Sequence, residues 1–277
     1  MTKPVVMATP LTFINGAAGD SLSSHDRGLA YGHGVFETMR LGSGDIPLRA
    51  HHLARLAEGL RQLAIPCDPG AIEAQLLALL PAMPADGTVK LVVTAGIGPR
   101  GYRPAARGHP SVIVHWYPPA APVASARLRP CEYRLPVNPR LAGIKHLNRL
   151  DQVLAATELA EGEQGLLMDV DDRVIEALSH NLFALIDGQW RTPRLDRCGV
   201  AGVMRRYLLD TLLGEERAVE STLTLAQLAD ADEMFICNAV AGIVPVAAIV
   251  GVANWRSHPR SDGLRRRLAE RLPCFAQ

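Results

Sequence analysis

A proline-rich stretch near the middle of the chain most strongly limits how these 277 residues can fold. Residues 118–123 read Pro-Pro-Ala-Ala-Pro-Val, and consecutive prolines neither donate to a sheet nor continue a helix. We therefore predict a linker at 118–123 that separates an N-terminal domain, residues 1–117, from a C-terminal domain, residues 124–277. The length is sufficient for one large or two modest hydrophobic cores.

Hydrophobic periodicity predicts both strands and helices on each side of this linker. In the N-terminal part we predict strands over residues 12–15, 35–41, 89–95 and 111–117, and helices over 49–63 and 70–80. In the C-terminal part we predict a Pro- and Arg-rich loop up to Lys145, helices over 147–160 and 202–213, and strands over 165–170, 173–178, 182–186, 233–237 and 243–250. Because helices and strands mix without regular alternation, the predicted class is α+β.

Composition excludes several functional classes. The net charge of +1 argues against a nucleic-acid surface or a polybasic membrane anchor. The most apolar stretch, residues 239–253, is too short to span a bilayer, and the N-terminus lacks the layout of a signal peptide. The five cysteines show neither CxxC pairing nor metal-ligand spacing, so we expect reduced thiols, a cytoplasmic protein and no metal site.

Lysine is rare in this sequence. Three lysines, Lys3, Lys90 and Lys145, stand against 26 arginines. An arginine stays protonated at any working pH, whereas a buried lysine amine can lose its proton and attack a carbonyl group. Lys145 lies among apolar residues just before a predicted helix. A surface lysine at a helix start is the simpler interpretation, but the scarcity of lysine and the surrounding motif favour a Schiff-base lysine.

Residues 96–101 match the pattern G-x-G-x-x-G of a dinucleotide-binding loop and follow a predicted strand. However, Pro99 stands between the second and third glycines, and no acidic residue for a ribose occurs before Glu132. We predict instead a tight loop that brings Arg100, Tyr102 and Arg103 over a pocket, where the two cations could hold a carboxylate.

The residues needed by a pyridoxal phosphate (PLP) enzyme each have a candidate in this chain. Lys145 is the candidate Schiff-base lysine, and Glu176, at the end of a predicted strand, could pair with the pyridine nitrogen. Residues 199–205 run from a glycine-rich loop into a helix, whose free amides would favour a phosphate. Arg55 could add a guanidinium. The alternatives are an exposed edge-strand position for Glu176 and a solvated helix face for Arg55.

Several segments resemble the fold-type IV PLP-dependent enzymes, a class IV aminotransferase-like family. The segments that carry this resemblance are residues 26–38, His52 to Leu56, Lys145, Glu176 with Asn181 to Phe183, the glycine loop before Met204 and Arg205, and residues 236–239. The resemblance implies two domains, a smaller N-terminal α/β domain and a larger C-terminal α/β domain, with the cofactor between them. It also implies a homodimer.

The resemblance assigns a role to each candidate residue. It implies that Lys145 binds the PLP aldehyde and that Glu176 pairs with the pyridine nitrogen. The phosphate would be held by Arg55 and by the amides of Gly202, Val203 and Met204, with Asn238 and Ala239 closing its side.

Within the family, the chain is most similar to the lyases that convert 4-amino-4-deoxychorismate to 4-aminobenzoate and pyruvate in folate biosynthesis. The similarity rests on residues 142–150, 100–102, 192–196 and 232–238. We expect substrate contacts from Arg100, Tyr102, Arg103, Phe36 and His33, the last of which stands where the family usually has Asp. The alternatives are a class IV aminotransferase acting on D-amino or branched-chain amino acids, and a PLP-carrying protein that only binds or regulates.

Overall fold

The computed structural model describes residues 10–104, 108–214, 216 and 218–276, so Lys3 lies outside the described residues. Contacts group the chain into two units. The first comprises Met1–Ala121 together with Lys145–Leu147, and the second comprises Pro122–Ile144 and Asn148–Gln277. The chain therefore first passes from one unit to the other after Ala121, inside the stretch that we predicted as a linker.

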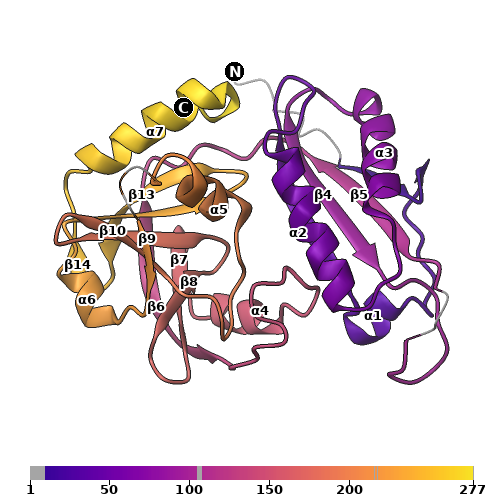
Figure 1. The fold of residues 1–277 in the computed structure, drawn as a ribbon, viewed down its shortest axis with the longest axis horizontal. Coiled ribbons are helices and arrows are strands. Elements are labelled where there is room, and N and C mark those ends of the chain that lie inside the picture. The colour runs from indigo at the N-terminus through magenta and orange to yellow at the C-terminus, as the bar shows by residue number, and fades with distance from the viewer. Residues whose placement is uncertain (1–9, 105–107, 215, 217, 277) are drawn as a thin grey trace, which may run out of the picture. The chain divides into compact units, whose positions relative to one another are not determined.

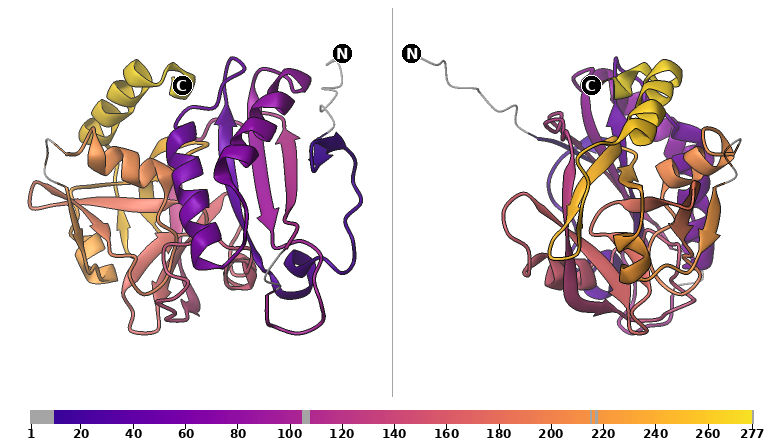
Figure 2. Two further views of the ribbon diagram at one scale, coloured as in Figure 1. Left: turned by 45° about the vertical axis from the view of Figure 1, so that its right-hand side comes forward. Right: turned by 90° about the vertical axis from the view of Figure 1, so that its left-hand side faces the viewer.

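The first unit is an antiparallel sheet with the strand order β2-β1-β5-β4-β3 (Figure 1). Its strands are β1 (Leu11–Ile14), β2 (Ala17–Ala18), β3 (Gly34–Leu41), β4 (Gly87–Thr94) and β5 (Ser111–Tyr117). Its helices are α1 (Arg27–Tyr31), α2 (Arg49–Gln62) and α3 (Pro69–Leu79). Figure 2 shows that α2 and α3 both lie on one side of this sheet.

Buried and partly buried side chains alternate along the strands, which explains why α2 and α3 cover one face of the sheet. In β3, Val35, Glu37, Met39 and Leu41 are buried, whereas Phe36, Thr38 and Arg40, which alternate with them, are only partly buried. The helices contribute Leu56 and Ile72, among others, to the same core. Burying this apolar surface stabilises the unit, at roughly 25 cal/mol for each Å² removed from water. Both predicted helices of this half are confirmed.

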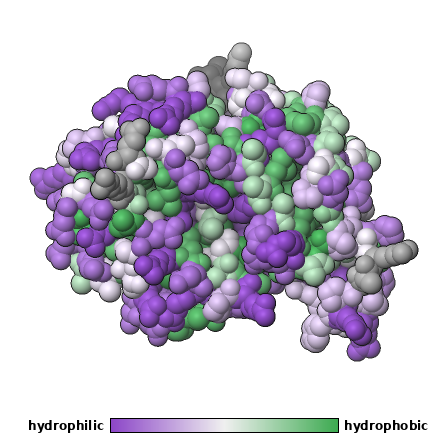
Figure 3. Space-filling view, in the orientation of Figure 1, coloured by the Kyte–Doolittle hydropathy of each residue, from purple (hydrophilic) through white to green (hydrophobic). Residues whose placement is uncertain are grey.

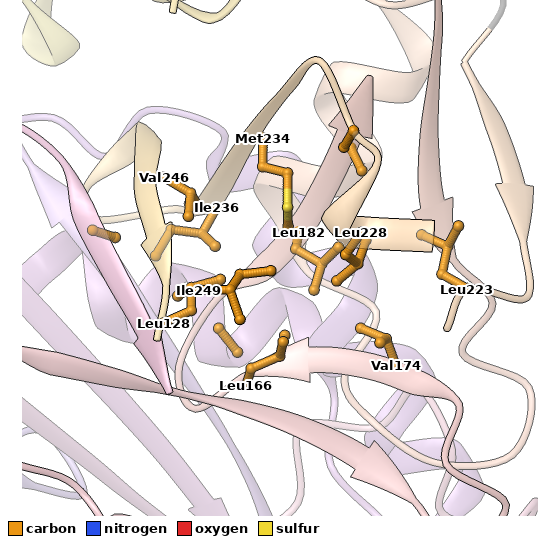
Figure 4. Packing of buried hydrophobic residues seen from close by; sticks show 14 of the residues in the cluster. Leu128, Leu166, Val174, Leu182, Leu223, Leu228, Met234, Ile236, Val246 and Ile249 are labelled. Carbon is orange, nitrogen blue, oxygen red and sulfur yellow. The ribbon is translucent and has the colours of Figure 1, made fainter. Parts of the chain in front are cut away.

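The second unit is built on a mixed sheet with the order β11-β10-β9-β12-β13-β6-β7-β8, and β14 pairs with β13. The strands are β6 (Ala126–Leu135), β7 (Glu163–Asp169), β8 (Val174–Ala177), β9 (Asn181–Ile186), β10 (Gln189–Pro193), β11 (Val219–Ser221), β12 (Glu233–Asn238), β13 (Gly242–Ile249) and β14 (Ala253–Asn254). The helices are α4 (Leu150–Ala156), α5 (Val203–Asp210), α6 (Leu225–Ala229) and α7 (Pro259–Arg271). Leu128, Leu166, Leu182 and Ile236 converge from different strands in one buried cluster (Figure 4). The α+β class is confirmed.

The loop that we predicted between the linker and Lys145 is wrong in its first half. Residues 126–135 form β6, which pairs in parallel with β7 and β13. Ala126, Leu128 and Cys131 are buried, while Arg127 is exposed. Pro130 lies where the register with β7 shifts, a position at which a sheet tolerates proline.

Helix α4 is shorter than predicted, and α7 was not predicted. Residues 145–147 do not join α4, because Leu147 N donates to the carbonyl of Gly34 at 3.0 Å beside β3. Helix α7 is positioned by a distant residue, since the buried Glu233 carboxylate accepts hydrogen bonds from Arg260 N and Ser261 N, each at 2.9 Å. The outward side of α7 is hydrophilic, and Figure 3 shows it as part of the polar surface at the upper left.

None of the helices in the described ranges combines the length and the apolar character that a membrane crossing requires.

Candidate active site

The position of Lys145 is set by backbone pairing with β3. Phe36 N donates to Lys145 O at 2.9 Å, and His146 forms an antiparallel bridge with Val35. Gly34 permits the close approach, because a Cβ there would lie 2.6 Å from Leu147 Cδ1 and 2.7 Å from Val93 O. The Lys145 ammonium lies 4.4 Å from the centroid of the Phe36 ring. The lysine is therefore held against the face of the sheet opposite α2 and α3.

A buried acid on β3 organises two basic side chains of α2. Glu37 is 1% exposed, and its Oε2 lies 2.6 Å from His52 Nδ1. Arg55 Nε donates to Glu37 Oε1 at 2.8 Å, and Arg55 Nη2 donates to Oε2. His52 and Arg55 are three residues apart, so they share one helix face. Glu37 thereby fixes the orientation of the Arg55 guanidinium, which stays partly exposed.

The charges in this cluster follow from burial and pairing. Burial by itself would raise the pKa of Glu37, but the Arg55 guanidinium and the hydrogen bonds from His52 and Arg55 outweigh it and hold that pKa below its usual range. Burial lowers the pKa of His52 despite the neighbouring Glu37. The Nε2 atom of His52 is buried without a hydrogen-bond partner. His52 is therefore neutral near pH 7 and donates from Nδ1.

His52 is expected to make the protein less stable as the solution becomes acidic. Its folded-state pKa lies below the ordinary value of 6.5, so below that pH the unfolded chain takes up a proton that the folded chain does not. Stability is then lost at up to about 1.4 kcal/mol per pH unit for this one group. Urea unfolding of the wild type and of His52→Asn, between about pH 7.5 and pH 5.5, should show a smaller loss for the variant. Equal losses in the two proteins would contradict the assignment.

In the second unit, Glu176 and Asn181 hold the glycine-rich loop before α5. Glu176 is 5% exposed in β8, so it is not the solvated edge-strand residue of our alternative, and its Oε2 accepts from Val200 N at 2.9 Å. Asn181 Nδ2 donates to Val200 O at 2.9 Å. A Cβ on Gly202 would lie only 1.9 Å from Asn181 Oδ1. The absence of a side chain at Gly202 is therefore what lets this loop pack on β9.

The same loop is joined to the segment that leads into Lys145. Gly143 N donates to Gly199 O at 2.9 Å, and Ala201 N donates to Gly143 O at 3.1 Å. Only Ile144 separates Gly143 from Lys145 along the chain. Glycine is needed at 199, where φ is +84° and a Cβ would meet Ile175 Cγ2 at 2.6 Å.

The first turn of α5 suits an anion. Gly202 is its N-cap residue, no side chain caps the helix, and Val203 and Met204 begin it. The amides of such a turn point outward along the helix axis and favour negative charge. Asn238 is held at the end of β12, because its Nδ2 donates to Ser179 O at 3.3 Å and its Oδ1 accepts from Val240 N and Ala241 N. The Asn238 side chain thus shapes the turn containing Ala239.

The residues predicted to contact substrate all lie in the first unit. Arg100, Tyr102 and Arg103 are exposed on the loop between β4 and β5. Phe36 is partly buried under Lys145. For His33, Nδ1 accepts from Arg27 Nε at 3.3 Å and Nε2 lies 2.8 Å from Leu63 O. Both of its ring nitrogens are used within the protein, so His33 is positioned to support structure.

The sequence analysis assigned no role to Glu37, His52 or Asn181, although all three lie in segments that carry the family resemblance. Glu37 carried a signal, because it falls on the apolar phase of β3 together with Val35 and Met39, where an acid needs a partner. The spacing of His52 to Arg55 was a second signal. The contact that Asn181 makes could not be inferred locally, because its partner is a loop 19 residues away.

The comparisons with known proteins agree on one family. A family model for amino-transferase class IV matches residues 34–249. Aminodeoxychorismate lyase of Vibrio harveyi is 34% identical over 92% of this chain and 97% of its own. The crystal structure of 4-amino-4-deoxychorismate lyase from Pseudomonas aeruginosa is 42% identical, with a TM-score of 0.90 over 95% of this chain and 99% of that one. Branched-chain amino acid aminotransferase of Escherichia coli has a TM-score of 0.84 at 20% identity, over 96% of each chain, and so shows the fold alone.

Among the described residues, no group of three or more His, Cys, Asp or Glu side chains is arranged to hold a metal ion. Lys145 beside the Phe36 ring, the buried Glu176 and the uncapped N-terminus of α5 are groups of the kinds that a PLP site uses. With a family model covering most of its length and relatives matched nearly end to end, this chain belongs to the class IV amino-transferase family of PLP-dependent enzymes.

Proposed function

We propose that this protein is a PLP-dependent carbon–oxygen lyase that converts 4-amino-4-deoxychorismate to 4-aminobenzoate and pyruvate, a step of folate biosynthesis. The observation that carries the proposal is the position of Lys145, whose Nζ lies 4.4 Å from the centroid of the Phe36 ring. Lys145 belongs to the same unit as the loop that contains Arg100 and Tyr102. The relatives matched over nearly the whole chain, which bear the name of this lyase, support the choice of reaction.

The described residues fit PLP. The loop at Gly202 has room for no side chain, the first turn of α5 is uncapped by side chains, and Glu176 is a buried carboxylate one hydrogen bond away from that loop. We assign the phosphate to the amides of Gly202, Val203 and Met204, with Arg55, Asn238 and Ala239 beside it. We assign Glu176 to the pyridine nitrogen and Lys145 to the aldehyde. The buried and unpartnered Nε2 of His52 lies next to the Arg55 part of this set.

Bound PLP supplies an electron sink for the carbon that carries the substrate amine. The chain's own residues do the rest. The neutral Lys145 amine would take the proton from C4 of the substrate and would return a proton to the departing enolpyruvyl group. The Glu176 carboxylate would hold the pyridine nitrogen and favour its protonated form. Loss of the enolpyruvyl group as pyruvate leaves the aromatic 4-aminobenzoate.

Arg100 is expected to bind a carboxylate of the substrate. Because Arg100 is exposed on its loop, Arg100→Ala should raise KM for aminodeoxychorismate by about tenfold or more and leave PLP bound. Steady-state kinetics and the visible absorbance of the holoenzyme measure the two effects. Arg194→Ala is a matched control, since Arg194 is an exposed arginine of the second unit whose Nε faces the Glu220 carbonyl. Loss of PLP from Arg100→Ala would show that this arginine is wrongly placed.

The proposed reaction is tested by supplying enzymatically generated aminodeoxychorismate and measuring pyruvate and 4-aminobenzoate. A lyase forms both products in equal amounts without an added amino acceptor. An aminotransferase acting on D-amino or branched-chain amino acids needs a keto acid and returns the amino group to it. Product formation only with a keto acid would replace the proposal by this alternative, and a yellow protein inactive in both assays would indicate a binding or regulatory role.

We also infer a cytoplasmic homodimer that acts on a small molecule. Exposed apolar side chains support the dimer, because each unit carries some: Leu29 and Ile97 in the first, and Leu150, Val153 and Leu154 on α4 in the second. None of the five cysteines, all of which lie in the described ranges, forms a disulfide, as expected in a reducing compartment. Light scattering of the purified protein should give the mass of two chains, and a monomer at micromolar concentration would refute the dimer.

A further inference from the structure

We propose that Arg27 is a positioning residue that sets the conformation of the loop at 97–102 and thereby aims Arg100 at the substrate. This inference rests on the proposed function, in which Arg100 binds a substrate carboxylate. The loop connects β4 to β5 and contains the glycine pattern of residues 96–101. Arg27 lies in α1, about 70 residues earlier in the chain.

The Arg27 guanidinium holds the peptide groups on both sides of Arg100. Arg27 is 3% exposed. Its Nη1 donates to Pro99 O at 3.3 Å and to Gly101 O at 2.8 Å, and its Nη2 donates to Tyr102 O at 2.9 Å. Two of the bonded carbonyls, those of Pro99 and Gly101, flank Arg100 directly, and the third, that of Tyr102, follows one residue later. All three bonds are made by one planar charged group. They therefore fix the conformation of the backbone at Arg100, and not only the distance between Arg100 and α1.

Arg27 can act as a fixed point because the residue before it is anchored. Asp26 is fully buried, and its Oδ1 caps α1 by accepting from Gly28 N at 2.7 Å. Its Oδ2 accepts from Thr94 Oγ1 at 2.9 Å and from Ser111 Oγ at 2.7 Å. Thr94 ends β4 and Ser111 begins β5, so α1 is tied to the two strands from which the loop emerges.

Two tyrosine rings and two glycines also take part in the contact between α1 and the loop at 97–102. The Arg27 guanidinium carbon lies 4.7 Å from the Tyr31 ring centroid, and the Tyr31 hydroxyl accepts from Gly101 N at 2.9 Å. The Tyr31 and Tyr102 rings meet edge to face at 5.6 Å. A Cβ on Gly98 would lie 2.7 Å from Arg27 Cδ, and Gly101 has φ of +105°. The glycine pattern thus makes room for the arginine and for the turn around it.

His33 orients the remaining donor of Arg27. Since Arg27 Nε is a donor, His33 Nδ1 is the acceptor, and the ring proton resides on Nε2, which donates to Leu63 O. His33 thereby links Arg27 to the end of α2. This contact gives a physical role to the residue that replaces the family's usual Asp.

The experiment compares Arg27→Gln and Arg27→Lys with Arg61→Gln, a control arginine that pairs with the exposed Glu58 on α2. Arg27→Gln is expected to lower kcat/KM by about tenfold, mainly through KM and by no more than Arg100→Ala does, with PLP absorbance unchanged. Arg27→Lys should recover only part of this loss, because an ammonium cannot hold both carbonyls beside Arg100. Arg61→Gln should match the wild type. The double variant Arg27→Gln/Arg100→Ala should be no worse than Arg100→Ala alone.

Amide hydrogen exchange gives a readout that does not depend on activity. In Arg27→Gln the peptide covering 97–104 should exchange faster, while the peptide covering 111–117 stays as protected as in the wild type. If Arg27→Gln fails to fold, Tyr31→Phe tests the same contact, because it removes only the hydroxyl that accepts from Gly101 N.

The outcomes separate the inference from the proposed function. Unchanged exchange at 97–104, or losses that add in the double variant, would overturn the role of Arg27. Faster exchange at 97–104 in a protein without lyase activity would uphold Arg27 as the residue that orders the loop and would refute the proposed reaction instead.

Discussion

Lys145→Arg is expected to abolish covalent attachment of PLP and to lower kcat by at least about 10³-fold. The guanidinium keeps a positive charge beside Phe36 but does not lose its proton, so it can neither bind the aldehyde nor take the C4 proton. Borohydride reduction followed by mass spectrometry of the peptide containing residue 145 measures attachment. Formation of 4-aminobenzoate measures turnover.

Lys90→Arg is the matched control, because Lys90 Nζ also faces the Phe36 ring, at 5.3 Å from its centroid. This variant should keep the reduced cofactor on Lys145 and keep its visible absorbance. A reduced cofactor attached to Lys90 in the wild type, or an active Lys145→Arg enzyme, would remove the basis of the proposed function. Partial recovery of Lys145→Ala by a small added amine would support the role of the amine directly.

Glu37→Gln is expected to lower the free energy of unfolding by about 3 kcal/mol. The substitution keeps the shape of the side chain but removes the charge that compensates Arg55 and accepts from His52 inside the core. A buried cation left without its partner retains its desolvation cost and loses the offsetting attraction. The released Arg55 should also bind phosphate less well. Urea unfolding and PLP titration measure the two effects.

An exposed pair on the same helix provides the control for Glu37. Glu58 pairs with Arg61 at 2.6 Å, and both side chains are more than half exposed. The Arg61 hydrogen bond lowers the pKa of Glu58 to about 2, yet exposed pairs contribute less than about 1 kcal/mol because water and salt screen them. Glu58→Gln should therefore leave stability and PLP affinity almost unchanged. Equal effects of the two substitutions would mean that the Glu37 cluster has no special role.

The parts of the fold that were predictable are those with strong local periodicity. Strand β5 has the bounds that alternation predicted, and α2 and α3 differ from prediction by one residue at most at each end. Strand β6 was not predicted, because a run containing Pro130 and several arginines resembles a loop until its parallel partners β7 and β13 are known. Helix α4 begins later than its sequence suggests, because Leu147 is bonded to β3 instead.

In the candidate site, too, some residues could be predicted from local sequence patterns and others could not. Lys145, Glu176 and the glycine loop before α5 could be selected from the sequence, because each has an unusual residue type in a local pattern, although their joint use for PLP stays a proposal. His33 could not be interpreted locally, since its two ring nitrogens meet Arg27 and Leu63, the latter 30 residues away.

The sequence by itself determined the chemical groups available and the elements with clear periodicity, because both depend on residue type and near neighbours. Only the tertiary structure decided which groups act together. Glu37 pairs with His52 and Arg55 because β3 packs against α2. Arg27 donates to carbonyls more than 70 residues away because α1 is bonded to β4 and β5. Such contacts leave no local pattern, because a hydrogen bond depends on where two segments meet in space and not on their separation along the chain.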